Sequence, residues 1–387
     1  MTLAAPLERD AVATAAAVAG RFAAAVDGEN RFPAEAVDEL RRQGLLGLLV
    51  PASAGGMGGR LADACEIASA LGAECLSTGL IWAMHSQQVA IMADHAADQW
   101  GEVLADVAGG ALVASATTEP GKSGTLRFAH APLHLDGDEV HVDRPSPVVS
   151  YGAEADYHLV TMRGGPSSAE TDVRYLLLSR EDGCVTGDWS AMGMRGTRSV
   201  PMRFEASVPL DRVLAKDFRH VAATTAIPAA HLGWTSAWYG AARGALEGFV
   251  ALLREGGARD HRRMASDLFT TRLGDIRLRL DLLDSMLSRL VDRYEAMRAA
   301  NAPAEAYEQP DWTIALNGLK VAGSRISHET VDSLITVAGL ARGYLRGDAL
   351  ALERRFRDLR SASLMVNNDE LLQLNARRML LDAPTST

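Results

Sequence analysis

The first hundred residues carry apolar positions at helical spacing. An Ala-rich amphipathic pattern over 7–26 predicts a helix. A second helix is expected between Pro33, which suits a first helical position, and Gly44, which is typical of a helix end. The same spacing returns over 61–71 and 80–92, so the chain is expected to begin as a set of packed helices.

After Ala111 the pattern changes to short segments of alternating polar and apolar residues. Asp136-Gly137-Asp138 separates two such segments and predicts a hairpin, because glycine accepts the positive φ of a tight turn. Further strands are predicted over 157–162, 173–179 and 200–206.

From Trp234 onward the pattern is helical again. Helices are predicted over 234–254, 263–298, 312–338, 349–359 and 368–381. In the second of these, residues three and four apart form one apolar stripe: Leu273, Ile276, Leu280, Leu283, Leu287 and Leu290. Three more apolar residues widen that stripe: Leu278, Leu282 and Met286. A helix with so wide an apolar face is typical of a bundle or a subunit interface.

This order of segments predicts an α+β fold with three domains. An N-terminal helical domain is expected over 1–110, a central β-domain over 111–212 and a C-terminal bundle of four-helix type over 213–387. The length of 387 residues agrees, since a single core rarely holds so many.

Composition limits the kinds of molecule that the protein is expected to bind. The formal net charge is −10 and the two signs are interspersed, which argues against a nucleic-acid surface and favours a small-molecule ligand. Three cysteines without CxxC spacing make a disulfide framework improbable. No signal peptide and no uninterrupted apolar run of membrane-spanning length is recognisable, so a cytoplasmic location without membrane contact is expected.

Five segments, in this order, resemble the acyl-CoA dehydrogenase family of flavoproteins. They are Gly44–Pro51 with the glycines of 55–59, Thr117-Thr118-Glu119-Pro120-Gly121, Ala155–Val160, Met192–Ser199 and Phe356-Arg357-Asp358. The resemblance covers nearly the whole chain. It implies an FAD-dependent oxidoreductase that acts on a CH–CH bond of an acyl thioester, carried on CoA or an acyl carrier protein. It also implies a homo-oligomer, a dimer or a homotetramer, with an electron-transfer flavoprotein or a flavin reductase as partner.

The resemblance implies a set of flavin-binding residues in the β-domain. Ser115 leads into the loop, Thr117 and Thr118 contact the ring, and Ser123 and Gly124 contact the diphosphate. Backbone N–H groups and hydroxyls suit a ring that gains negative charge on reduction. An ordinary Gly/Ser/Thr turn is the alternative.

Two positions later in the β-domain also face the ring in the family. Ser150 falls where a hydroxyl donates toward flavin N5, and a strand-end serine is the alternative. Val148 falls where many members carry an aromatic residue, so the ring is less covered here.

Further cofactor contacts are expected from the C-terminal helices, several of them toward a second subunit. Arg262, Arg272 and Gly339 occupy the places of the family's Arg-x-x-Phe, Gln and Gly-Gly motifs, all poorly kept. Asn368 is also predicted to contact the flavin. Ordinary surface charge and a helix end are the alternatives for the first three.

The residue at the expected position of the catalytic base differs from the Glu of the family. Counting along the sequence from Arg357-Asp358 gives Val366 as the position of the family's usual catalytic Glu. Some members place this Glu at the start of the first C-terminal helix, and the residue there is Ala230. Neither side chain takes a proton. His231 and Glu370 are the neighbouring candidates for a base, and the favoured alternatives are a structural histidine and a solvated helix residue.

Three functions therefore remain open. The first is an acyl-thioester dehydrogenase with an unusual base. The second is a two-component flavin-dependent monooxygenase on the same fold, which takes reduced flavin from a partner reductase. The third is a catalytically silent subunit of a hetero-oligomer. A metal site at His130 and His134 and a nucleotide-binding P-loop at 55–59 are improbable, since neither segment has the required context.

Overall fold

The computed structural model describes residues 8–121, 126, 128–347 and 349–381. The predicted contacts Ser123 and Gly124 lie outside these residues. Helices come first along the chain: α1 (Arg9–Gly28), α2 (Ala34–Arg42), α3 (Leu61–Glu74), α4 (Leu76–His95) and α5 (Gly101–Ala108). Gly44 has a φ of 70°, which explains why α2 ends just before it.

Seven strands in the described residues form two sheets. They are β1 (Val113–Ala116), β2 (His134–Asp136), β3 (Glu139–Val149), β4 (Tyr157–Arg163), β5 (Val173–Ser179), β6 (Gly183–Val185) and β7 (Val200–Pro209). One sheet has the order β1-β4-β5, with β1 and β4 parallel, and the other has the order β2-β3-β7-β6. The predicted hairpin is confirmed, because β2 pairs with β3 in antiparallel register around Gly137 at a φ of 60°.

The remaining chain is helical. Its elements are α6 (Phe218–Val221), the π-helix η6 (Ala222–Ala226), α7 (Ile227–Glu255), α8 (Ala258–Met264), α9 (Asp267–Ala299), α10 (Ala304–Glu308), α11 (Pro310–Ala338), the π-helix η7 (Leu340–Tyr344), α12 (Leu352–Leu359) and α13 (Asn368–Leu381). Short 3₁₀ turns lie at Leu45–Gly47, Ala52–Ala54, Arg180–Asp182, Arg195–Thr197, Leu210–Arg212 and Arg360–Ser363.

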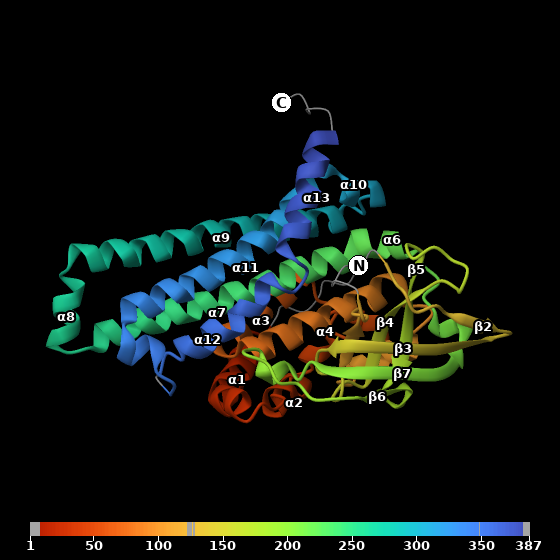
Figure 1. The fold of residues 1–387 in the computed structure, drawn as a ribbon, viewed down its shortest axis with the longest axis horizontal. Coiled ribbons are helices and arrows are strands. Elements are labelled where there is room, and N and C mark those ends of the chain that lie inside the picture. The colour runs from red at the N-terminus through yellow and green to blue at the C-terminus, as the bar shows by residue number, and fades with distance from the viewer. Residues whose placement is uncertain (1–7, 122–125, 127, 348, 382–387) are drawn as a thin grey trace.

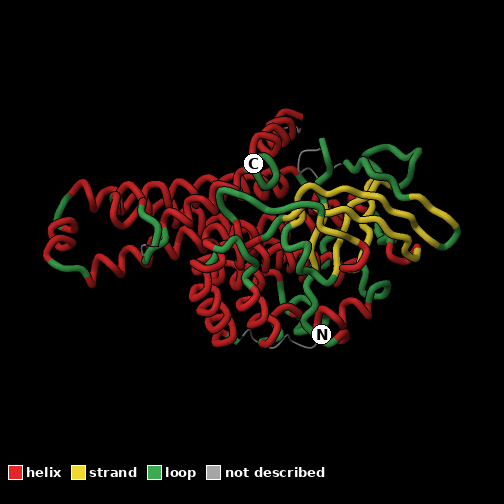
Figure 2. Tube along the Cα trace, turned by 60° about the horizontal axis from the view of Figure 1, so that its bottom comes forward, coloured by secondary structure: helices red, strands yellow, loops and turns green. Residues whose placement is uncertain are grey.

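The sheets lie at one end of an elongated molecule and the long helices at the other (Figure 1). Helices α7, α9 and α11 run side by side, and α8 joins α7 to α9 at the end far from the strands (Figure 1). The tube view shows the same separation of strands from helices (Figure 2). The predicted α+β fold, with a β-domain between helical N- and C-terminal regions, is confirmed.

The apolar stripe of α9 is also confirmed. Ile276, Leu280, Leu283 and the later stripe residues are buried. Of the three residues expected to widen the stripe, Met286 packs against the core, whereas Leu278 and Leu282 are 56% and 61% exposed. Thus one face of α9 packs into the bundle, and a second apolar strip faces outward.

Two details of the helix predictions were wrong. The helix expected from Arg263 is interrupted, since α8 ends at Met264 and α9 begins at Asp267. The short helix α5 and the two π-helices were not predicted at all, since segments of five to eight residues carry too little periodicity to show it.

Helix α1 is long and apolar enough to cross a bilayer by length and composition, with a mean hydropathy of 1.2. One face of α1 is buried within the protein, through Ala15, Ala19, Ala23 and Val26 among others. Ala15, Ala19 and Ala23 belong to the main core, which is the ordinary reason for such a helix. Cys65, Cys75 and Cys184 are free thiols, as expected.

Two of the motifs quoted above meet in space. Asp358 accepts a hydrogen bond of 2.6 Å from the backbone N–H of Met194, and Arg357 binds Asp27 of α1 at 2.6 and 2.9 Å. A Cβ at Gly193 would lie 2.2 Å from the Arg357 carbonyl oxygen, so this contact requires glycine. The Arg-Asp pair therefore fastens α12 to the β-domain loop and to α1.

Candidate functional site

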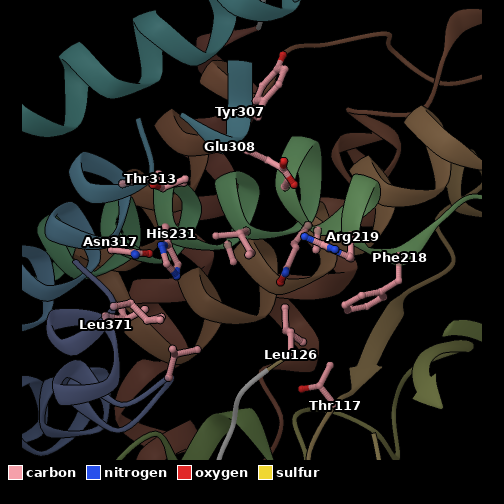
Figure 3. Close-up of a pocket in the computed structure, with 18 of the residues that line it drawn as sticks. Thr117, Leu126, Phe218, Arg219, His231, Tyr307, Glu308, Thr313, Asn317 and Leu371 are labelled. Atoms are coloured by element: carbon pink, nitrogen blue, oxygen red, sulfur yellow. The ribbon is translucent and has the colours of Figure 1, made fainter. Parts of the chain in front are cut away.

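A cavity of about 650 Å³ lies between the β-domain and the C-terminal helices. Its size is typical of small-molecule sites, roughly 300–1,000 Å³. Figure 3 shows Thr117 and Leu126 on one side of it and His231, Asn317 and Leu371 on the other. Most of the wall is apolar, and it includes residues from β1, α4, α6, α7, α10, α11 and α13.

The end of β1 supplies hydroxyl groups to this cavity. Ser115 and Thr117 line it, as the flavin prediction requires. Thr118 is turned toward β3, where its hydroxyl donates to the Val148 carbonyl at 2.8 Å and accepts from the Val148 N–H at 3.3 Å. Thr118 and Val148 are therefore brought together, and Val148 is 40% exposed.

Beneath this loop lies a buried ionic anchor. The Glu119 carboxylate accepts from the backbone N–H groups of His130 and Ala131, at 3.0 and 2.8 Å. Arg144 lies 3.9 Å away, fully buried, and also donates to the Thr161 carbonyl. Burial lowers the pKa of Arg144 to about 10, so it stays charged opposite Glu119. The Glu of the Thr-Thr-Glu-Pro-Gly motif thus fixes the loop and does not enter the cavity.

Ser150 belongs to a short chain of hydroxyls. Its Oγ lies 3.0 Å from Ser199 Oγ, which lies 2.8 Å from Thr197 Oγ1. Thr197 in turn donates to the Met194 carbonyl at 2.8 Å. Since each hydroxyl has one proton, Ser199 donates to Thr197 and Ser150 donates to Ser199. Ser150 is not among the described residues that line the cavity, and its proton is directed to Ser199 and not toward the predicted place of flavin N5.

At the opposite wall, Val366 has a φ of 55°. This left-handed conformation is unfavourable for a β-branched residue, and such strain is retained where the surroundings enforce it. The Lys320 ammonium donates to the Val366 carbonyl at 2.6 Å and to Asn368 Oδ1 at 2.8 Å. Asn368 donates to Ser324 at 3.0 Å, so Asn368 holds this turn and is not turned to the cavity.

Lys320 is fully buried, and no salt bridge pairs it with a described carboxylate. Burial lowers its pKa to about 7. Since a buried ammonium is costly, its retention under the Val366 turn indicates that the turn depends on it.

Three residues that were predicted at or near the position of the missing base all line this cavity. They are His231, Val366 and Glu370. His231 is 4% exposed, and burial, then the charge of Lys320, lowers its pKa to about 3. A histidine held neutral in this way is a weak base. Glu370 is partly buried in the first turn of α13 and faces the same space as Val366. Ala230 also lines the cavity, so both positions predicted for the family's base present only alkyl groups.

The predicted contacts in the C-terminal helices lie elsewhere. Arg262 and Arg272 are exposed on α8 and α9, at the end of the bundle away from the strands (Figure 1). Gly339 follows α11 with a φ of 81°. None of the three lines the cavity within this chain. The neighbouring Arg263 and Arg342 are used internally, in bonds to the Val337 carbonyl and to Asp260.

Several lining residues were missed by the sequence analysis. They are Gln87 and Gln88 of α4, Phe218 and Arg219 of α6, Trp234 of α7, and Tyr307 and Glu308 of α10. A signal existed for α4, where consecutive polar residues from His85 to Gln88 lie in a helix buried on all sides. The short helices α6 and α10 carried no sequence signal that would have identified their lining residues. The described residues contain no cluster of His, Cys, Asp or Glu that would hold a metal ion.

The donor set suits a flavin ring. Ser115 and Thr117 bring hydroxyls to the cavity edge, next to an apolar wall that a flat aromatic ring can contact. The β1 end thus fits the ring, whereas the arginines among the described lining residues, Arg219 and Arg378, come from two different helices, α6 and α13.

Solved structures with the same fold cover almost the whole chain. FMN-bound TdsC from Paenibacillus sp. A11-2 has a TM-score of 0.84 at 18% identity, covering 98% of each chain. KijD3 in complex with FMN and dTDP-3-amino-2,3,6-trideoxy-4-keto-3-methyl-D-glucose has a TM-score of 0.84 at 21% identity, covering 99% of this chain and 97% of that one. A chain from work on the electron transferring flavoprotein of Acidaminococcus fermentans has a TM-score of 0.83 at 17% identity, covering 99% and 100%. No curated protein sequence matches significantly.

Two family models match the sequence itself. The acyl-CoA dehydrogenase N-terminal domain matches residues 7–111, and the acyl-CoA dehydrogenase C-terminal domain matches residues 232–368. Together they span most of the chain and flank the β-domain, so the protein belongs to the acyl-CoA dehydrogenase family of flavoproteins.

Proposed function

We propose that the protein is a flavin-dependent monooxygenase, which transfers one oxygen atom of O₂ to a small, largely apolar substrate. Among its structural neighbours, TdsC is a dibenzothiophene monooxygenase and another is a nitrososynthase from Micromonospora carbonacea var. africana. At about 20% identity these neighbours support the fold, and the choice of reaction rests on the residues of the cavity.

The observation that carries the proposal is the wall formed by Val366 and Ala230. A family dehydrogenase needs a base there to take the proton next to a thioester carbonyl, and neither residue accepts one. His231 is held neutral with a pKa of about 3, so it is a poor substitute. The same alkyl wall is suitable for oxygen transfer, which benefits from a cavity with little water.

The chain's own residues would have three tasks. Ser115 and Thr117 would bind the polar edge of the flavin ring. Apolar residues, including Val366 and Phe218, would hold the substrate and exclude water. Reduced flavin, when bound, supplies the two electrons that split O₂ into the transferred atom and water.

We further propose that reduced flavin comes from a separate reductase. The resemblance predicts FAD, whereas the solved neighbours TdsC and KijD3 hold FMN. The C-terminal family motifs for the diphosphate are poorly kept here, and two arginines near them are engaged internally. Release of the flavin from denatured protein, with its identity established by mass, decides between FAD and FMN.

The test of the reaction uses the purified protein with its bound flavin. We expect reduced flavin to be consumed with oxygen on a stopped-flow timescale, and an apolar aromatic substrate such as indole to accelerate this. Flavin reduction by straight-chain acyl-CoA should be very slow. Rapid reduction by acyl-CoA, with no oxygen-dependent chemistry, would overturn the proposal.

The second candidate is the acyl-thioester dehydrogenase, with Glu370 as its base. It is favoured by the position of Glu370, which lines the cavity beside Val366. In that case Glu370→Gln abolishes flavin reduction by the thioester, and an electron-transfer flavoprotein takes the electrons. Bound flavin that reacts with neither acyl-CoA nor oxygen would point instead to a silent subunit.

A further inference from the structure

Helix α4 presents two glutamines to the cavity, and hydrogen bonds fix the orientation of both amides. Gln87 Nε2 donates to the Ala226 carbonyl at 2.9 Å, and Gln88 Nε2 donates to the Met84 carbonyl at 3.3 Å. A carbonyl oxygen only accepts, so the end of each amide that faces it must be the NH₂ group. The Oε1 atoms of both glutamines are therefore directed elsewhere.

These two oxygens are hydrogen-bond acceptors that keep accessible surface. No described residue donates to either of them. Unlike His231 Nδ1 and Trp234 Nε1, which are fully enclosed and without a partner, neither glutamine oxygen is enclosed. Gln87 and Gln88 are only 7% and 2% exposed and both line the cavity, so the accessible surface of the oxygens faces the cavity. A ligand in the cavity can therefore reach them.

The oxygen of Gln87 lies beside the apolar part of the cavity wall. Its amide nitrogen is bonded to Ala226, the last residue of η6, and the oxygen shares one carbon atom with that nitrogen. The neighbouring residues of η6 and α7 line the cavity with alkyl groups: Ala222, Ala223 and Ile227. The hydroxyls expected at the flavin come instead from the end of β1. The acceptors thus face the region that the proposed function assigns to the substrate.

Helix α4 brings no charge to the cavity. Gln87 and Gln88 are its described lining residues, and the charged lining residues come from α6, α10 and α13. An ammonium group between two neutral amides would keep most of the cost of its desolvation, whereas a neutral N–H group needs only an acceptor. The α4 wall is therefore suited to a neutral hydrogen-bond donor.

We propose that Gln87 and Gln88 form an acceptor pair that selects substrates with a neutral N–H group. Such a group loses its hydrogen bond to water in an apolar cavity, and either oxygen restores it. An aromatic N–H matches better than a hydroxyl, because it only donates and requires no donor on the same wall. The substrate class is then a compact nitrogen heterocycle or aromatic amine. The inference rests on the proposed function for the oxygen transfer, whereas binding is tested without it.

Indole and benzofuran have nearly the same shape, and only indole has an N–H group. We expect the flavin-loaded protein to bind indole at least about fivefold more tightly, as one net buried hydrogen bond provides. Titration calorimetry measures the two dissociation constants. Equal affinities, or tighter binding of benzofuran, overturn the inference. A preference for indole that exists only without flavin also overturns it, because the N–H of the flavin ring would then occupy these oxygens.

Matched variants locate the effect. Gln87→Met and Gln88→Met keep the length of the side chain but remove the acceptor, so each should lower the preference for indole while the affinity for benzofuran changes little. Gln99→Met is the control, since the Gln99 amide also donates to backbone carbonyls, those of Asp211 and Val213, but does not line the cavity. An unchanged preference in both α4 variants, or an equal loss in Gln99→Met, would show that the assignment is wrong.

The binding result and the reaction are separable. A preference for indole that depends on Gln87 or Gln88, without any oxygen-dependent turnover, supports the acceptor pair and contradicts the monooxygenase. Oxygen-dependent turnover of both probes, without a preference for indole in binding, has the opposite meaning.

Discussion

At the scale of single residues, Val366 decides the chemistry of the cavity. It stands where counting from the Arg357-Asp358 motif predicts the family's base, in a left-handed conformation, with its carbonyl held by Lys320. If the lack of a base limits proton abstraction, Val366→Glu should raise the rate of flavin reduction by acyl-CoA by roughly 10²-fold or more, since a positioned base supplies about 10²–10⁴. Single-turnover absorbance of the flavin measures this rate.

Val366→Gln is the matched control, because it has the same size and polarity as the glutamate but takes no proton. The glutamine variant should leave the rate low. Equal rates in the two variants would show that the shape of the pocket, and not the base, limits the reaction.

Lys320 gives a second prediction at this scale, in the dependence of stability on pH. Its folded pKa of about 7 lies below the value of 10.5 for an ordinary lysine. Between these two values the unfolded chain binds one more proton than the folded chain, so this lysine makes the free energy of unfolding rise as pH rises from 7 toward 10.5. The urea midpoint of the unmodified protein should therefore rise relative to that of Lys320→Met between pH 7 and pH 9.5.

A constant gap between the two proteins over that range would mean that the ammonium titrates normally in the fold. In that event the bonds to Val366 and Asn368, or water that reaches the ammonium, would compensate for the cost of burying the charge.

The sequence located some of these residues and not others. Val366, His231 and Glu370 were found by counting from a motif, and all three line the cavity. Lys320 was missed because a lysine in a long amphipathic helix is ordinarily exposed. Only the packing of α11 against α7 and the Val366 turn shows that it is buried.

At the scale of elements, regular segments were predictable and irregular ones were not. The span of β5, a short apolar run, agrees with its prediction to the residue, and so does that of α13. The π-helix η6 depends on packing around the cavity, and short-range sequence does not encode it. The break at Ala265 and Ser266 was hidden because apolar spacing continues on both sides of it.

The end of α11 yields a prediction on backbone strain. Gly339 adopts φ 81° and ψ −178°, a region that essentially only glycine occupies, and a Cβ there would meet no atom within 4 Å. Gly339→Ala should therefore lower the free energy of unfolding by about 1–3 kcal/mol through backbone strain alone.

Gly274→Ala is the counterpart in the interior of α9, where a Cβ also meets nothing. There the substitution should stabilise the protein by about 0.5–1 kcal/mol, as alanine does in a helix. Denaturant titration of both variants tests the two predictions. An unchanged free energy of unfolding in Gly339→Ala would show that the turn after α11 relaxes to accept alanine.

At the scale of the whole molecule, the outward strip of α9 predicts association with a second copy. Leu278 and Leu282 are more than half exposed on a helix whose other face is buried. We expect light scattering to give the mass of a dimer or tetramer at micromolar concentration. Leu278→Glu with Leu282→Glu should shift it toward the monomer.

Leu135→Glu on the β2 hairpin is the control, since that leucine is equally exposed at the other end of the molecule. It should not change the mass. A monomer in the unmodified protein would remove the expected partner for Arg262, Arg272 and Gly339.

The cavity itself was beyond prediction, because it is assembled from elements distant in sequence. The family resemblance places the flavin loop and the base position in one site, but it does not tell which side chains of α4, α6 and α10 join them. Those contacts arise only when the helices pack across the β-domain.

That assembly has a consequence for how the protein is made. Ser115 of β1 leaves the ribosome early, whereas Leu371, Leu374 and Arg378 of the same cavity are among the last described residues to be synthesised. Contacts between segments so far apart form late, because the intervening chain must first be ordered. The nascent β-domain therefore has only part of the cavity before α13 is made, and capture of the flavin is expected to follow the synthesis and packing of α13.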